Sequence, residues 1–146
     1  MNKENNLNIE KLFNLALKDH KENNFKSAEK NYKKILIEQP NHFNTLYLLG
    51  TLNFQIQKFS EAKKYFESAI LINPNHAELC NNFGATLISV GECDRAIEYI
   101  QRAISILPKY AQAYNNLGSA FKELKDYEKS IYFFEKAIHT QPNLID

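Results

Sequence analysis

The stretch Tyr114-Asn115-Asn116-Leu117-Gly118-Ser119-Ala120-Phe121 contains a pattern that recurs along the chain at a fixed interval. Its glycine has equivalents at Gly50 and Gly84, with 34 residues between successive copies. The four prolines of the chain keep the same spacing, and they are Pro40, Pro74, Pro108 and Pro142. A constant period of this length predicts a row of similar units rather than one central globule.

The proline spacing divides the chain into four repeats. With each proline at position 32, the repeats are residues 9–42, 43–76, 77–110 and 111–144. Residues 1–8 form a polar lead-in, and residues 145–146 resemble the start of a following helix. Each repeat should form two helices joined by a short turn, because apolar residues recur at spacings of three and four.

A small residue at position 8 of every repeat predicts close packing of helices. It is Ala16 in the first repeat and glycine in the other three. Glycine inside a helix is about 1 kcal/mol less favourable than alanine, so its recurrence suggests that a neighbouring helix approaches closely there. A β-branched residue at Gly84 or Gly118 should therefore force the two helices of a repeat apart.

The repeats resemble tetratricopeptide repeats over nearly the whole chain. The matching features are Leu49-Gly50, Phe83-Gly84 and Leu117-Gly118 at positions 7 and 8, alanine at positions 20 and 27 of most repeats, and proline at position 32 of all four. The resemblance implies an all-α fold, a right-handed superhelical solenoid of four helix-turn-helix repeats. It also implies that the first helices line a concave groove, which in this family usually binds peptides or partner proteins.

The resemblance assigns groove-lining side chains by their position in the repeat. Most of them are amide, hydroxyl or apolar groups, and few are charged. The expected peptide-binding residues are Asn14, Tyr47, Leu48, Thr51, Phe54, Asn81, Asn82, Ala85, Ile88, Asn115, Asn116, Ser119 and Lys122.

Asparagine occupies position 6 in three of the four repeats, as Asn14, Asn82 and Asn116, whereas the second repeat has Leu48. The pattern is similar to the asparagine ladder of O-linked N-acetylglucosamine transferases. Because an asparagine side chain both donates and accepts hydrogen bonds, such a row could hold the backbone of an extended peptide. The alternative is that these residues are ordinary solvated side chains.

The two ends of the array differ. Lys18 stands where later repeats carry leucine, threonine or alanine, and a polar outer face is expected at the end of a solenoid. The last predicted helix instead carries Ile131, Phe134 and Ile138. We expect either that a further helix follows this one or that this face self-associates.

Composition argues against several other functions. The formal net charge is +1, from 18 basic and 17 acidic side chains, which does not indicate a nucleic-acid-binding protein. No stretch has the length of a signal peptide or a membrane span, so we expect a cytoplasmic protein without a membrane partner. Cys80 and Cys93 are expected to be buried free thiols. No metal-binding or phosphate-binding spacing is present, and no cofactor is expected.

These observations together favour a non-catalytic scaffold that binds a polypeptide segment of unknown identity in its groove. Two alternatives stay open. The chain could be the substrate-recruiting arm of a larger glycosyltransferase or sulfotransferase, or it could be a homo-oligomeric assembly scaffold.

Overall fold

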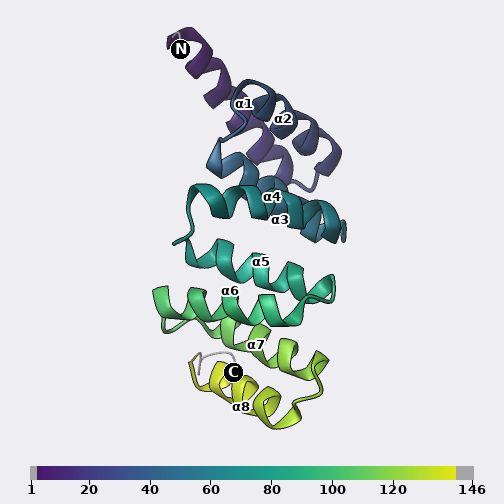
Figure 1. Cartoon of the computed structure of the whole chain (residues 1–146). Coiled ribbons are helices and arrows are strands. Elements are labelled where there is room, and N and C mark those ends of the chain that lie inside the picture. The colour runs from purple at the N-terminus through teal and green to yellow at the C-terminus, as the bar shows by residue number, and fades with distance from the viewer. Residues whose placement is uncertain (1–2, 141–146) are drawn as a thin grey trace. The chain divides into compact units, whose positions relative to one another are not determined.

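The computed structural model describes residues 3–140, and within them it contains eight α-helices and no strand. The helices are α1 (Lys3–Lys21), α2 (Phe25–Glu38), α3 (Phe43–Gln55), α4 (Phe59–Ile72), α5 (Ala77–Ser89), α6 (Cys93–Ile106), α7 (Ala111–Glu123) and α8 (Tyr127–Thr140). Consecutive helices pack as four hairpins, α1–α2, α3–α4, α5–α6 and α7–α8 (Figure 1). The all-α repeat fold predicted from the period is therefore confirmed. Along this part of the chain, no helix is long and apolar enough to cross a membrane.

The chain divides into two compact units, residues 1–72 with α1–α4 and residues 73–146 with α5–α8. We call them the N-terminal unit and the C-terminal unit. Within the N-terminal unit, α2 also packs against α3. Within the C-terminal unit, α7 contacts both α6 and α5 in addition to its hairpin partner α8.

The periodic prolines end the second helix of a repeat. Helices α2, α4 and α6 end two residues before Pro40, Pro74 and Pro108, respectively. Proline has no backbone N–H for a helical hydrogen bond, and its ring excludes the preceding residue from helical geometry. Pro142 lies outside the described residues, as do residues 145–146, where a further helix was expected to begin.

The turn inside each hairpin depends on one residue with a positive φ angle, at position 15 of every repeat. These residues are Asn23, Gln57, Gly91 and Lys125, with φ of 62°, 60°, 83° and 62°. In each turn the next N–H donates to a carbonyl five residues earlier, for example from Glu92 to Leu87 at 2.8 Å. This is the Schellman arrangement that closes a helix C-terminus. It explains Gly91, the glycine that does not follow the period of the other three.

The glycines at position 8 lie directly under a large side chain of the partner helix. A Cβ atom on Gly50 or Gly118 would meet Phe66 at 2.6 Å or Phe134 at 2.7 Å, and a Cβ atom on Gly84 would overlap the side chain of Ile100. These distances are far below van der Waals contact, so the predicted close approach is confirmed.

Buried residues of α1, α2 and α3 form the core cluster of the N-terminal unit. Tyr32, Ile35, Leu49 and Leu52 are all fully buried. Burial raises the pKa of Tyr32 to about 12, and its hydroxyl lies 3.3 Å from Nδ1 of His20. The other ring nitrogen of His20 lies 2.9 Å from Oε1 of Gln55, which connects α1 to the end of α3.

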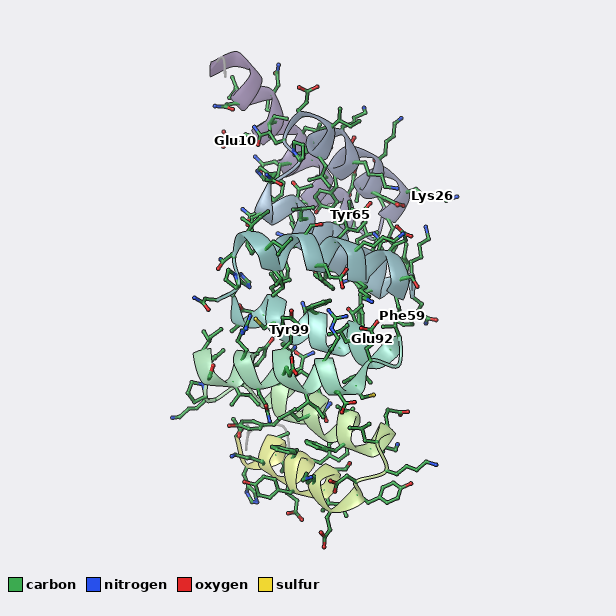
Figure 2. The ribbon with its side chains drawn as sticks, in the orientation of Figure 1. Glu10, Lys26, Phe59, Tyr65, Glu92 and Tyr99 are labelled. Atoms are coloured by element: carbon green, nitrogen blue, oxygen red, sulfur yellow. The ribbon has the colours of Figure 1, made fainter. Side chains whose placement is uncertain are left out.

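The C-terminal unit has an equivalent core. Phe83, Leu87, Ile100 and Leu117 have at most 1% of their surface exposed. Tyr99 of α6, which is labelled in Figure 2, packs edge-on against Phe83, with ring centroids 4.6 Å apart. Cys80 and Cys93 are free and buried, as predicted.

Helix α1 begins at Lys3 and therefore includes most of the polar lead-in expected for residues 1–8. Residues 3–8 contain neither proline nor glycine, and Ile9 is buried with 8% exposure. Once a helix is held by such a contact, extending it by another turn is easy, because nucleation is the unfavourable step.

Candidate peptide-binding surfaces

The residues expected to line the groove all lie on first helices, but their exposure varies. Exposed are Asn14 on α1 and Asn115 and Lys122 on α7. Half-buried are Tyr47, Leu48, Thr51 and Phe54 on α3, Asn82, Ala85 and Ile88 on α5, and Asn116 and Ser119 on α7. Asn81 on α5 is fully buried. The structure thus separates residues that a ligand can reach from one that it cannot.

In the C-terminal unit, the asparagines of α5 and α7 form one hydrogen-bond network. Nδ2 of Asn116 donates to Oδ1 of Asn81 at 2.8 Å. Nδ2 of Asn81 lies 3.3 Å from the hydroxyl of Tyr110 and 3.4 Å from Oδ1 of Asn82. Asn81 therefore connects the two helices from the inside and fixes the side chain of Asn116 at the surface.

We call Asn82, Asn115, Asn116 and Ser119 the amide surface of the C-terminal unit. The hydroxyl of Ser119 donates to the carbonyl of Asn115 at 3.1 Å, in the same helix. A serine that bonds its own helix has used its proton, so the side-chain donors that this surface offers to a ligand are the amides.

The corresponding face of the N-terminal unit has different chemistry. Tyr47 stacks on Phe43 with ring centroids 6.4 Å apart and also contacts Phe66 at 6.2 Å. Phe54 meets Phe59 edge-on at 5.4 Å. We call Tyr47, Leu48 and Phe54 the aromatic surface of the N-terminal unit. Its side chains suit apolar ligand groups rather than a peptide backbone.

Two neighbouring hollows flank His42 in the N-terminal unit. One, of about 250 Å³, lies between α1 and the α2–α3 turn. Its lining is Asn6, Ile9, Glu10, Phe13, Gln39, His42 and Asn44, and Figure 2 shows Glu10 on the N-terminal half of α1. The other, of about 540 Å³, is lined by residues 38–44 of the turn itself. Neither hollow was expected from the sequence.

A side-chain pair between position 5 and position 34 was also missed. Phe13 packs against His42 with ring centroids 5.5 Å apart, and Asn81 meets the hydroxyl of Tyr110. Both pairs are 29 residues apart and occupy the same two positions of their repeats. The first repeat combines two rings, whereas the third combines an amide with a hydroxyl. Because the residues at both positions change together between the two repeats, comparison of the repeats could have identified this pair from the sequence.

The elements and their spacing define a class of helical-repeat proteins. Family models described as "Tetratricopeptide repeat" match residues 20–82, 77–110 and 111–144. The chain therefore belongs to the tetratricopeptide repeat family. Membership supports a role in protein interaction, and proteins built from these repeats are typically non-catalytic scaffolds.

Solved structures of a protein named MamA are similar to the chain. One crystal structure of MamA is 28% identical, with a TM-score of 0.87 over 94% of this chain and 75% of that chain. A second is 27% identical, with a TM-score of 0.85 over 92% and 79%. A third, residues 41 to the end of MamA from Desulfovibrio magneticus RS-1, is 20% identical, with a TM-score of 0.87 over 94% and 78%, and shows the fold alone. No curated protein sequence matches the chain.

Proposed function

We propose that the chain is a non-catalytic scaffold that binds an extended, largely uncharged peptide segment through the amide surface of the C-terminal unit. The observation that carries this proposal is the hydrogen bond from Asn116 to the buried Asn81. It supports a binding role because it holds a partly exposed amide in one orientation before any ligand arrives.

Because its side chain is already held in one orientation, Asn116 is well suited to hydrogen-bond the backbone of a bound peptide. One N–H of its amide is used within the protein, which leaves a second N–H and the carbonyl oxygen for the two halves of a peptide group. Fixing a flexible side chain on binding usually costs about 0.5–1.5 kcal/mol, and part of that cost has already been met by the fold. Asn115 is exposed one residue earlier on the same helix.

The surroundings of the amide surface favour a ligand with small or apolar side chains. Ala85 and Ile88 are half-buried on α5, one and two turns beyond Asn82, and offer apolar contact. Lys122 is the one charged residue among the expected groove residues of this unit, and it is exposed. We further propose that the aromatic surface of the N-terminal unit contacts apolar side chains of a ligand.

The test begins with peptides selected on the wild-type chain from a random-sequence display library. For each selected peptide, Asn116→Ala should weaken binding by at least about 1 kcal/mol, or about fivefold, measured by calorimetric titration. Asn24→Ala is the matched control, because Asn24 is exposed and makes no side-chain cap hydrogen bond. Circular dichroism should show the same helicity for all three proteins.

Peptides with single N-methylated backbone amides identify the bonded group. Methylation of the N–H that meets Asn116 should weaken binding to the wild-type chain and have little further effect on Asn116→Ala, since both changes remove the same bond. Equal losses on both proteins at every methylated position, or unchanged affinity of Asn116→Ala, would refute backbone recognition by this residue.

A further inference from the structure

Helix α8 carries an apolar stripe that the rest of the described chain leaves uncovered. Tyr127, Ile131 and Ile138 are 60%, 58% and 56% exposed. Phe134 is half-buried beside them and reaches back over Gly118 of α7. The spacing of four, three and four residues places all four side chains along one side of the helix. We call these residues the α8 stripe.

Helix α6 of the same unit shows how such a stripe is covered. Its residues at the equivalent positions are Cys93, Ile97, Ile100 and Ile104. Cys93 and Ile100 are buried and the other two are half-buried. Ile100 lies over Gly84 of the hairpin partner α5, and the other helix that packs on α6 is α7 (Figure 1). In this fold, therefore, the surface presented by the α8 stripe is the kind on which the first helix of a repeat packs.

A polar group next to the stripe completes the comparison. Asn81 of α5 is buried because α7 packs there, and it bonds Asn116 and Tyr110 of that next repeat. Asn115 of α7 stands exactly one repeat later and is exposed. The α8 stripe and Asn115 thus offer to a further helix the same combination that α6 and Asn81 offer to α7.

The face of α7 that meets α6 defines what such a helix must carry. Gly118 of α7 faces Phe134 of α8, and Asn116 faces α5. The fully buried Ala113 and Ala120 lie on the side between these two and therefore face α6. The fitting helix has small residues seven apart and an asparagine between them.

We propose that the α8 stripe and Asn115 form a docking site for an amphipathic helix of another polypeptide, with small residues at the places of Ala113 and Ala120 and an asparagine at the place of Asn116. The exposed Glu128 and Glu135 run along one edge of the stripe, so a helix with basic residues on that edge is favoured. This site shares Asn115 with the amide surface, but it uses neither Asn82 nor Asn116 and does not depend on the function proposed above.

The first helix of a second copy does not fit this description. Helix α1 has Lys11 and Lys18 at the places where α7 has its two buried alanines, and both lysines are exposed. Packing α1 on the stripe in the same way would press two ammonium groups against isoleucine and tyrosine side chains, and buried unpaired charge is strongly unfavourable. The partner is therefore a different helix rather than the start of the same chain.

The probe is a fluorescent synthetic peptide with the sequence of residues 109–125, which contains α7. A second form carries a hydrocarbon staple between the places of Gln112 and Ser119, away from the two alanines, because short isolated helices are marginal in water. In anisotropy titrations with the full chain, the stapled peptide should bind saturably. The same peptide with lysine in place of both alanines, as in α1, should not bind.

Variants of the chain locate the site. Ile131→Ser with Ile138→Ser should weaken binding of the stapled peptide by at least about tenfold, because two exposed apolar side chains lose their contact. Ile37→Ser is the matched control, since Ile37 is 76% exposed on α2. Asn116→Ala, which alters the amide surface, should leave the affinity of this peptide within about twofold.

Three outcomes would overturn the proposal. The stapled peptide does not bind, or it binds the double serine variant as tightly as the wild-type chain, or it binds equally well with lysines at the two alanine places. Light scattering tests the remaining possibility, that a second copy of the chain covers the α8 stripe. A dimer that Ile131→Ser with Ile138→Ser converts to monomer, together with failure of the peptide to compete with dimerisation, would assign the stripe to self-association instead.

Discussion

His42 caps the N-terminus of α3 with a ring nitrogen that can also bind a proton. Its Nδ1 accepts from the backbone N–H of Thr45 at 3.3 Å and lies 2.8 Å from the Thr45 hydroxyl. A protonated Nδ1 cannot accept, and burial lowers the pKa of His42 from its ordinary value. Glu10 and Glu38 line the hollows on either side of the ring.

This cap should make the stability of the chain depend on pH in one direction. Because the folded pKa lies below the unfolded one, the unfolded chain binds more protons near and below pH 6.5, so the free energy of unfolding rises with pH. The contribution is complete above the unfolded pKa and is lost as pH falls through the folded one. We expect a loss of about 0.5–2 kcal/mol, the usual range for a cap.

Urea denaturation of wild-type and His42→Asn chains between pH 5 and pH 8 measures this effect. Asparagine keeps a cap acceptor but does not titrate, so the variant should lose most of the pH dependence attributed to this site. His139→Asn, at an exposed position of α8, is the control and should retain it. If the two variants have the same pH profile, the cap of α3 is not what the proton disrupts.

The packing of α5 against α7 depends on the hydrogen bonds of Asn81. Asn115 occupies the same position in the next repeat and serves as an internal control. Asn81→Ala removes the acceptor of Asn116 and leaves the half-buried hydroxyl of Tyr110 without its amide partner. Loss of one member of a buried network typically costs about 1–3 kcal/mol. Asn115→Ala changes the same position of the next repeat, but that side chain is exposed, and we expect a change within about 0.5 kcal/mol.

Chemical denaturation of both variants, followed by circular dichroism, gives the comparison. Equal destabilisation by Asn81→Ala and Asn115→Ala would show that the network does not join the two helices.

At the level of the whole chain, the features predicted correctly were those repeated in every copy. The apolar spacing of three and four gave the two helices of each repeat, and the small residue at position 8 gave the close approach seen between Gly84 and Ile100. Features that are recognisable in the sequence of only one repeat were missed. Gly91 reveals the left-handed turn residue, but the other repeats place Asn23, Gln57 and Lys125 there, so the position showed no pattern.

The binding residues were harder to predict for a similar reason. Position in the repeat places Asn81 and Asn115 on the same face of their helices, yet one is buried and the other is exposed. The difference arises from what packs next to each helix, namely α7 beside α5, which periodicity alone does not contain. The likeness to an asparagine ladder stays a prediction, carried by Asn14, Asn82 and Asn116.

The division into two compact units predicts that a destabilising substitution in one unit leaves the stability of the other unit unchanged. Stability in a repeat protein is roughly a sum of repeat and nearest-neighbour contributions, and the core cluster of Tyr32, Ile35, Leu49 and Leu52 lies entirely in the N-terminal unit. Gly118→Val places a branched side chain where even a Cβ would come within 2.7 Å of the Phe134 ring. Overpacking of this kind typically costs about 1–3 kcal/mol.

Hydrogen exchange followed residue by residue should therefore show faster exchange in α7 and α8 of the Gly118→Val chain, by about tenfold to one hundredfold. Protection in α1–α4 should be unchanged, because the core cluster formed by α1, α2 and α3 lies within the N-terminal unit. Ile131→Val, a conservative change at an exposed position of α8, is the control and should alter neither group. Equal loss of protection in α1–α4 and in α7–α8 would mean that the chain opens as one cooperative body, and the additive description of its stability would be wrong.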